Sequence, residues 1–272
     1  MMQHVSKLSQ SELEIALYAP VCPELLPDDA VVVAEDGWYR TATPSSDFRP
    51  DNEILVSNLT GKNADSEIDR MFTEYHERIE RAFSWCVYPW TQPEYLGERL
   101  INLGGSDYEV SVFLENTSLP LKVVPGVSVK QVSETSAIDL ERYLRIMASR
   151  RAMSIDEITF RRQRYQRLIG GDSPVLQLFV AYCDNTPAGC CATILKRDYG
   201  YMTGAYIYPD FRAKGLFQSL LAAQHNALRD CGIKLSCGHA YTHGSGRWLE
   251  RFGFRKVYNY KVYVLKPEWL IT

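Results

Sequence analysis

The sequence predicts an α/β (α+β) protein with a mixed, largely antiparallel central sheet flanked by helices. Three observations lead to this class. Short apolar strands alternate with segments of helical periodicity. In the second half, three strands follow one another, and hairpin turn residues separate them at Asp184-Asn185 and Asp198-Tyr199-Gly200. The length of 272 residues predicts one large or two medium domains.

The composition is that of an ordinary soluble globular protein, with 46% hydrophobic and 23% charged residues. A net charge of −3 argues against a dedicated nucleic-acid partner, and the arginines between 150 and 167 are interpreted as a solvated helix face. No run of about 18 apolar residues predicts a membrane span. The N-terminus lacks the features of a signal peptide. The seven cysteines show no zinc-site spacing, so we expect a cytoplasmic protein without a bound metal.

The first half is expected to form a small α/β layer in the order strand, strand, helix, strand, helix, strand. The predicted strands are 38–43, 53–57, 83–89 and 108–115, and the predicted helices are 64–79 and a segment from Pro93 to Gly104-Gly105. The segment 116–126, with two prolines and a glycine, is the best candidate for a domain boundary. We therefore divide the chain into residues 1–120 and 127–272.

The second half begins again with a strand at 127–133. Two helices are expected next, at 137–151 and 154–168, and Ser154 with Glu157 has the form of a capping box at the start of the second. Strands at 175–182, 189–197 and 199–208 follow. The loop after the last strand leads into a helix at 216–229.

That loop, DFRAKG, carries the chemistry. Pro209 ends the preceding strand because it cannot donate to a ladder. A basic, glycine-containing loop at a helix N-terminus offers unpaired backbone N–H groups at the positive end of the helix dipole, which suits a phosphate or pyrophosphate. Gly215 permits a backbone path that a Cβ would obstruct, and Arg212 and Lys214 add positive charge.

With these elements in this order, residues 127–265 resemble the GNAT superfamily of acyl-CoA N-acyltransferases. In that family a proline ends the strand shortly before an Arg/Gln-x-x-Gly-x-Gly/Ala loop, and the matching residues here are Pro209, Arg212, Gly215 and Phe217. Downstream, a strand over 233–241, a helix closing in Gly253-Phe254 and aromatic strands over 257–265 complete the pattern. The resemblance implies the GNAT fold and acetyl-CoA as the co-substrate.

The resemblance also implies a binding site, formed by Ala205, Tyr206, Ile207, Arg212, Ala213, Lys214, Gly215, Leu216 and Phe217. The backbone amides of Ala213 to Phe217 would hold the CoA pyrophosphate. The strand Ala205 to Ile207 would splay from Leu235 to Gly238, and the pantetheine arm would pair in the gap. A backbone N–H near Tyr206 or Ile207 would polarise the thioester carbonyl while the amine attacks directly.

Two residues depart from the family pattern. Phe217 stands where the loop usually carries Gly or Ala, which is acceptable if its side chain points into the core. Leu249 occupies the place of the tyrosine that in many members protonates the leaving thiolate. The nearest substitutes as acid or base are His239, Tyr241 and His243, alternate positions at and just after the end of a strand. Tyr206 and Tyr208 share one strand face, where either is a core residue or a substrate contact.

The first half carries no phosphate loop of its own, yet its strand, helix and strand over 83–115 resemble the late part of a second GNAT-like domain. The protein would then be a tandem with a degenerate first copy, in which Trp85, Tyr88 and Trp90 either pack in the core or line the acceptor site.

Two functions from different classes remain open. The first is an N-acetyltransferase acting on a primary amine, either a small molecule or a protein, as a monomer or homodimer. The second is a non-catalytic acyl-CoA-binding or scaffold module. A nucleotide-binding protein is disfavoured because the loop matches neither a Walker motif nor a GxGxxG motif.

Overall fold

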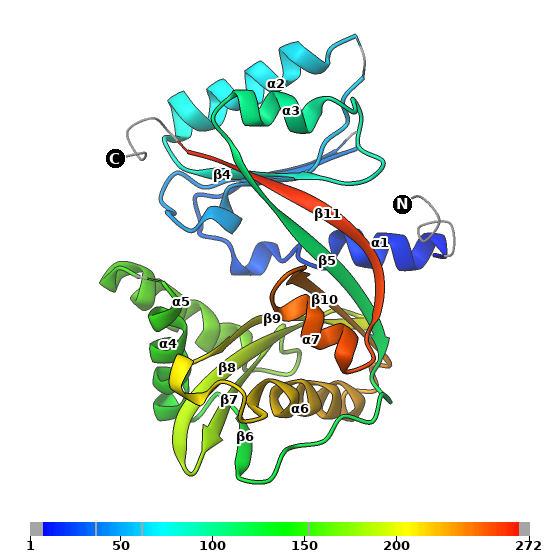
Figure 1. The fold of residues 1–272 in the computed structure, drawn as a ribbon. Coiled ribbons are helices and arrows are strands. Elements are labelled where there is room, and N and C mark those ends of the chain that lie inside the picture. Colours follow the sequence, from blue (N-terminus) through cyan, green and yellow to red (C-terminus); the bar gives the residue numbers. More distant parts are fainter. Residues whose placement is uncertain (1–7, 36, 61, 152, 267–272) are drawn as a thin grey trace.

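Two lobes joined by a pair of long strands form the molecule (Figure 1). The computed structural model describes residues 8–35, 37–60, 62–151 and 153–266. We call β1 to β4 with helices α2 and α3 the N-lobe, and β6 to β10 with helices α4 to α7 the C-lobe. β5 (Ser106–Asn116) and β11 (Arg255–Leu265) run through both. Within the described part of the chain, no helix is long and apolar enough to cross a membrane.

The N-lobe follows the predicted order of elements. Its strands are β1 (Val31–Glu35), β2 (Trp38–Ala42), β3 (Glu53–Val56) and β4 (Phe83–Val87), and its helices are α2 (Ala64–Thr73) and α3 (Leu96–Asn102). The single helix predicted over 64–79 is wrong in its second part: after Thr73 the chain widens into a π-helical turn, Glu74–Ile79. Glu80 then adopts left-handed backbone angles, which end the turn.

The C-lobe contains β6 (Val127–Gln131), β7 (Leu176–Cys183), β8 (Thr186–Leu195), β9 (Tyr199–Ile207) and β10 (Leu235–Tyr241). Its helices are α4 (Ala137–Arg150), α5 (Ile155–Leu168), α6 (Leu216–Asp230) and α7 (Ser245–Arg251). The Ser154 side chain caps α5 by accepting from the Glu157 N–H. The Glu157 carboxylate turns instead to Arg151 and Arg161, so only half of the expected capping box forms.

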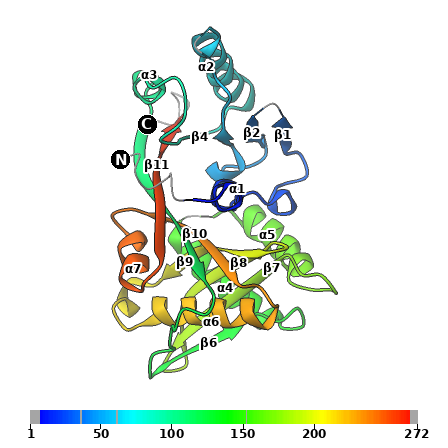
Figure 2. The same ribbon diagram turned by 90° about the vertical axis from the view of Figure 1, so that its right-hand side faces the viewer.

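Helices cover both faces of the C-lobe sheet (Figure 2). Leu176, Leu178 and Val180 pack in one cluster with residues of α4 and α5. The alternate residues Phe179, Ala181 and Cys183 pack against α6. This alternation follows from the two-residue period of a strand. The helices α4 and α5 therefore lie on one face of the sheet and α6 on the other.

The eleven strands of the described residues form one sheet, in the order β1-β2-β3-β4-β11-β5-β10-β9-β8-β7-β6. Among these strands only β3–β4 and β9–β10 pair in parallel within the part of the chain that the structure describes, so the mixed, largely antiparallel sheet confirms the predicted class. β5, which follows the N-lobe helices in sequence, lies between β10 and β11. β11, which ends the C-lobe, lies between β5 and β4. Each lobe thus receives a strand from the other.

The same order of elements occurs twice. β3, α2, β4, α3 and β5 in the first half correspond to β9, α6, β10, α7 and β11 in the second. Val110 of β5 pairs with Tyr260 of β11, and the two long strands are antiparallel about this pair. The two halves are therefore related by a pseudo-two-fold axis near that pair.

Three features differ from the sequence expectations. α1 (Gln10–Tyr18) and β1 lie in stretches for which no element was predicted. α1 begins with a complete capping box formed by Ser9 and Glu12 and lies between the lobes beside β5 (Figure 1). The aromatic strands expected over 257–265 are one long strand, β11, with a register shift between Lys256 and Tyr258.

Candidate active site

The loop between β9 and α6 has the backbone shape of an anion site. A 3₁₀ turn, Pro209–Phe211, follows β9, and α6 begins at Leu216. Ala213 (φ +61°) and Gly215 (φ +80°) are both left-handed. Ser219 donates its N–H to the Gly215 carbonyl, so the amides before it in α6 lie at the open, positive end of the helix. The arrangement suits a phosphate held by backbone N–H groups.

The side chains around this loop leave its outer surface polar. Arg212, Ala213 and Lys214 are exposed. Arg212 approaches the Ile207 carbonyl at 3.4 Å, and the Lys214 ammonium lies 5.0 Å from the Phe211 ring centroid. Both cations therefore stand beside the amides and would add Coulomb attraction for an anion.

Gly215 is required by packing as well as by backbone angle. A Cβ at this position would lie 2.6 Å from Val124 Cγ2 and 2.8 Å from Val124 Cβ. Val124 is fixed there because its N–H donates to Ser219 Oγ, and Ser219 Oγ donates in turn to the Gly215 carbonyl. Val124, in the segment 116–126 that was predicted to be a boundary, thus packs against the start of α6.

β9 and β10 part beside this loop. They pair from Tyr199–Leu235 to Met202–Gly238 and no further. Beyond these residues β9 continues to pair with β8, and β10 continues to pair with β5. The inner edges of 203–207 and 239–241 therefore face each other without a shared ladder, and Ala205, Tyr206 and Ile207 lie in this separated part. The expected partner stretch was wrong: Leu235 to Gly238 are the residues that still pair with β9, and the separation begins after them.

A β-bulge lies where the strands part. Thr203 pairs with Ala192 and Tyr206 with Cys190, so Gly204 and Ala205 together oppose Cys191. Gly204 adopts φ +65°. A bulge rotates the neighbouring backbone amides out of the ladder and commonly occurs beside active sites. Sequence reasoning missed it, although a glycine inside a strand was the available signal.

An apolar cluster lines the α6 side of this region. Phe113, Met202, Leu221, Ala240, Leu249 and Phe254 are its buried members. Phe217 is half-buried and packs against the cluster, with its ring centroid 6.2 Å from that of Phe252. The Phe217 side chain therefore points inward, and its backbone amide remains at the helix start.

His239 lies on the opposite face of the sheet, covered by α1. Its Nε2 is 2.8 Å from the Ala16 carbonyl, and its Nδ1 is 3.1 Å from the Tyr260 hydroxyl. A carbonyl only accepts, so Nε2 carries the proton and Nδ1 accepts from Tyr260. Burial lowers the pKa of His239 to about 4, although the hydrogen bond to Ala16 opposes the shift. Both ring nitrogens are thus engaged while α1 is in place.

The other two candidate acid–base residues have separate surroundings. Tyr241 is 46% exposed, and its ring centroid lies 5.0 Å from that of Tyr108. His243 follows the strand and is exposed, and its Nδ1 lies 3.4 Å from Arg247 Nη2. His239, Tyr241 and His243 therefore do not converge on one point, and their catalytic roles stay a prediction.

Tyr206 in β9 and Tyr208, just after it, face the same side as His239. Tyr206 and Tyr208 are half-buried, and their ring centroids are 6.1 Å apart. They pack against the core cluster that contains Tyr201 and Tyr260, the two tyrosines whose rings contact His239. They share one face as predicted, beside the point where the strands part.

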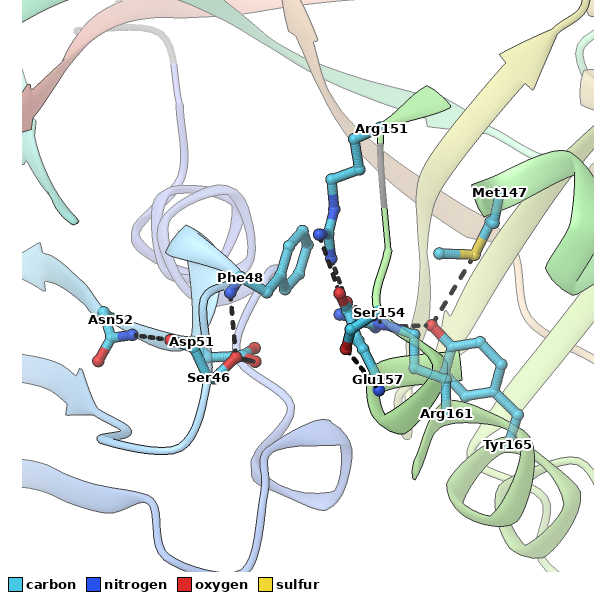
Figure 3. Close-up of polar contacts among 10 residues, drawn as sticks. All are labelled: Ser46, Phe48, Asp51, Asn52, Met147, Arg151, Ser154, Glu157, Arg161 and Tyr165. Atoms are coloured by element: carbon cyan, nitrogen blue, oxygen red, sulfur yellow. Dashed lines mark hydrogen bonds and ion pairs between the residues drawn. The ribbon is translucent and has the colours of Figure 1, made fainter. Parts of the chain in front are cut away.

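An aromatic side chain from the loop between β2 and β3 packs against the α4–α5 turn (Figure 3). The Phe48 ring centroid lies 4.5 Å from the guanidinium carbons of both Arg151 and Arg161. Both arginines bind the Glu157 carboxylate, and buried Arg161 also donates to the Tyr165 hydroxyl at 3.1 Å. Ion pairing with Glu157 thus holds the two arginines in place, and cation–π contact packs them against the loop that precedes β3.

Among the residues that the structure describes, no three His, Cys, Asp or Glu side chains are grouped closely enough to hold a metal ion.

Comparison with known proteins relates this region to a protein family. Residues 143–254 match the model of the "Acetyltransferase (GNAT) family". These residues form a GNAT domain. The match contains β9, the loop, α6 and β10, and thus the whole of the proposed cofactor site. The family uses acetyl-CoA for acetyl transfer, and this carries over to the domain at that general level. No curated protein matches the chain in sequence.

Solved structures extend the likeness to the whole chain. A GCN5-related N-acetyltransferase from Kribbella flavida has a TM-score of 0.63 and 14% identity, covering 92% of this chain and 95% of its own. A tandem GNAT protein from the clavulanic acid biosynthesis pathway has a TM-score of 0.57 and 13% identity, covering 92% of each chain. A functionally unknown conserved protein from Staphylococcus epidermidis ATCC 12228 has a TM-score of 0.68 and 14% identity, covering 91% and 98%. At these identities the likeness concerns the fold.

The GNAT domain lacks the usual acid at one position. Leu249, which stands where many members of the family carry a tyrosine, is 4% exposed and belongs to the apolar cluster. A side chain at this place in α7 reaches the region where β9 and β10 part, but leucine has no proton to transfer.

Proposed function

We propose that the chain is an acetyl-CoA-dependent N-acetyltransferase that transfers the acetyl group to a primary amine by direct attack in a ternary complex. One observation carries the proposal: the left-handed, basic loop at the start of α6 adjoins two strands that part at a β-bulge. A phosphate site and an unpaired strand edge are thus adjacent, as a long CoA molecule requires.

The pyrophosphate would bind the backbone amides of Ala213 to Phe217, with Arg212 and Lys214 adding charge. The pantetheine arm would run along Ala205, Tyr206 and Ile207 and pair with the edge that β10 leaves free. An amide N–H of Tyr206 or Ile207 would then stabilise the negative charge that develops on the thioester oxygen. The amine nitrogen attacks the carbonyl carbon, and the C–S bond breaks as the tetrahedral intermediate collapses.

The leaving thiolate needs a proton, and the amine must lose one. Leu249 supplies neither, so we propose Tyr241 or His243, which α1 does not cover, ahead of His239. The acceptor would be a small molecule or an amine on a protein. The active species would be a monomer or a homodimer in the cytoplasm. The division into residues 1–120 and 127–272, with a degenerate first copy, is part of the same proposal.

The cofactor site is tested by thermal stability with and without acetyl-CoA. At about 100 times its dissociation constant, the ligand should stabilise the wild-type protein by roughly 2.7 kcal/mol. The double variant Arg212→Glu/Lys214→Glu should lose most of this gain, because both side chains are exposed and their reversal repels phosphate. Arg145→Glu is the matched control, since Arg145 is an exposed arginine on α4, across the sheet.

Turnover separates the two functions that the sequence left open. An enzyme would release free CoA thiol when offered a panel of primary amines. Stabilisation by acetyl-CoA without thiol release from any amine would favour the non-catalytic binding module. An absence of stabilisation at saturating concentrations would refute both.

A further inference from the structure

The two lobes contain equivalent positions where their parallel strands part. In the C-lobe the last parallel pair is Met202–Gly238, and in the N-lobe it is Ile54–Trp85. Gly238 also pairs with Phe113, three residues beyond Val110. Trp85 pairs with Tyr263, three residues beyond Tyr260. Because Val110 and Tyr260 pair at the pseudo-two-fold axis, Gly238 and Trp85 are counterparts.

In the C-lobe this position carries no side chain. A Cβ on Gly238 would meet Met202 Cε at 3.7 Å and Leu249 Cδ1 at 4.0 Å, which are ordinary contacts. Because Gly238 has no side chain, β10 places no atoms at this position on the α6 side of the sheet, where the two strands part. Its neighbours there are the apolar side chains of the Met202 and Leu249 cluster.

In the N-lobe an indole occupies the equivalent place. Trp85 is completely buried among residues of β3 and α2. Its Nε1–H donates to Ser57 Oγ at 3.1 Å, and Ser57 is the residue that follows β3. Ser57 lies three residues after Ile54, as Ala205 lies three residues after Met202. The ring therefore bridges to the stretch that corresponds to the proposed pantetheine edge.

The rest of the N-lobe keeps the bulge, while an amide of the loop before α2 is hydrogen-bonded within the protein. β3 retains a bulge, since Tyr39 pairs with Val56 and Arg40 with Ile54. In the loop before α2, however, the Asn63 carboxamide oxygen accepts from the N–H of Thr60 at 2.9 Å and from its hydroxyl at 2.6 Å. An amide of this loop is thus already satisfied by the protein itself.

We propose that Gly238 admits the pantetheine arm to the C-lobe and that Trp85 closes the equivalent path in the N-lobe, so that each chain binds one acyl-CoA. This inference rests on the proposed function. It assigns Gly238 a role in cofactor binding and restricts the N-lobe to completing the sheet and holding the α4–α5 turn.

Calorimetric titration of the full-length wild-type protein with acetyl-CoA tests the stoichiometry, and one molecule per chain is expected. Arg212→Glu/Lys214→Glu should weaken that single site and reveal no second one. Two molecules per chain in the wild-type protein, one of which still binds unchanged in this variant, would overturn the inference while leaving the acyltransferase proposal in place. No binding by the wild-type protein would overturn both.

A size series at Gly238 tests the residue itself. The dissociation constant should rise with side-chain volume from Gly238→Ala through Gly238→Val to Gly238→Trp, reaching about a hundredfold or more for tryptophan. Far-UV circular dichroism and the melting temperature without ligand identify the variants that fold, and the alanine and valine variants keep the test decisive if the tryptophan variant does not. An affinity independent of side-chain size would overturn the role of Gly238.

Discussion

Replacing Gly215 by alanine separates the two reasons for a glycine at the start of α6. The first reason is its backbone angle, φ +80°, which is left-handed. The second is Val124, whose Cγ2 would lie 2.6 Å from the new Cβ, closer than real Cβ atoms approach. Gly232 provides a matched control because it adopts φ +75° and a Cβ there would meet nothing within 4 Å. The difference between the two variants is therefore the cost of the contact with Val124.

The magnitudes follow from these geometries. A left-handed alanine costs roughly 1–2 kcal/mol, partly offset because alanine restricts the unfolded chain more than glycine does. Gly232→Ala should therefore destabilise the protein by about 1 kcal/mol. Overpacking adds about 1–3 kcal/mol at Gly215, so Gly215→Ala should cost about 2–4 kcal/mol in total.

Urea unfolding monitored by circular dichroism would measure both variants and the double variant Val124→Gly/Gly215→Ala. Removing the Val124 side chain should eliminate the contact term, so that the alanine then costs no more than at Gly232. Equal destabilisation by Gly215→Ala and Gly232→Ala in the wild-type background would refute the packing argument. The same result would remove Val124 from the account of how the phosphate loop is held.

Three further predictions concern the lobe junction. His239 has a folded-state pKa of about 4 and an unfolded value near 6.5, so the unfolded chain binds more protons between these values and stability falls as the pH is lowered. Between pH 7 and pH 5, the free energy of unfolding measured in urea should fall by about 2 kcal/mol more for the wild-type protein than for His239→Gln. Equal decreases would contradict a buried, neutral imidazole. For the contact in Figure 3, a double-mutant cycle of Phe48→Leu and Arg161→Met should give a coupling of about 0.5–1 kcal/mol, whereas strict additivity would argue against the cation–π contact. Residues 127–272 expressed alone should not fold, because β5 is missing from between β10 and β11, and co-expression with residues 1–120 should restore a soluble complex. A soluble fragment with native-like chemical shifts would show that the strand is dispensable.

Local patterns along the chain determined most of the elements and the position of the candidate phosphate loop. Strands such as β7 and β8 were predictable because they are apolar and end at turn residues, and α6 was predictable from its periodicity. The loop at Gly215 could be found because a basic, glycine-containing turn before a helix has a direct physical meaning. The bulge at Gly204 was also encoded locally but passed unnoticed.

Only the tertiary structure decided how the halves combine. A division near 120 follows from prolines and a glycine, but the exchange of β5 and β11 depends on pairing between residues such as Val110 and Tyr260, far apart in sequence. Strand pairing leaves no local signature, because the backbone groups that form it are the same in every residue. For the same reason the sequence could propose His239 as a proton carrier, but only the fold shows that its Nε2 is hydrogen-bonded to the Ala16 carbonyl. Likewise, only strand pairing shows that Gly238 and Trp85 occupy equivalent positions in the two lobes.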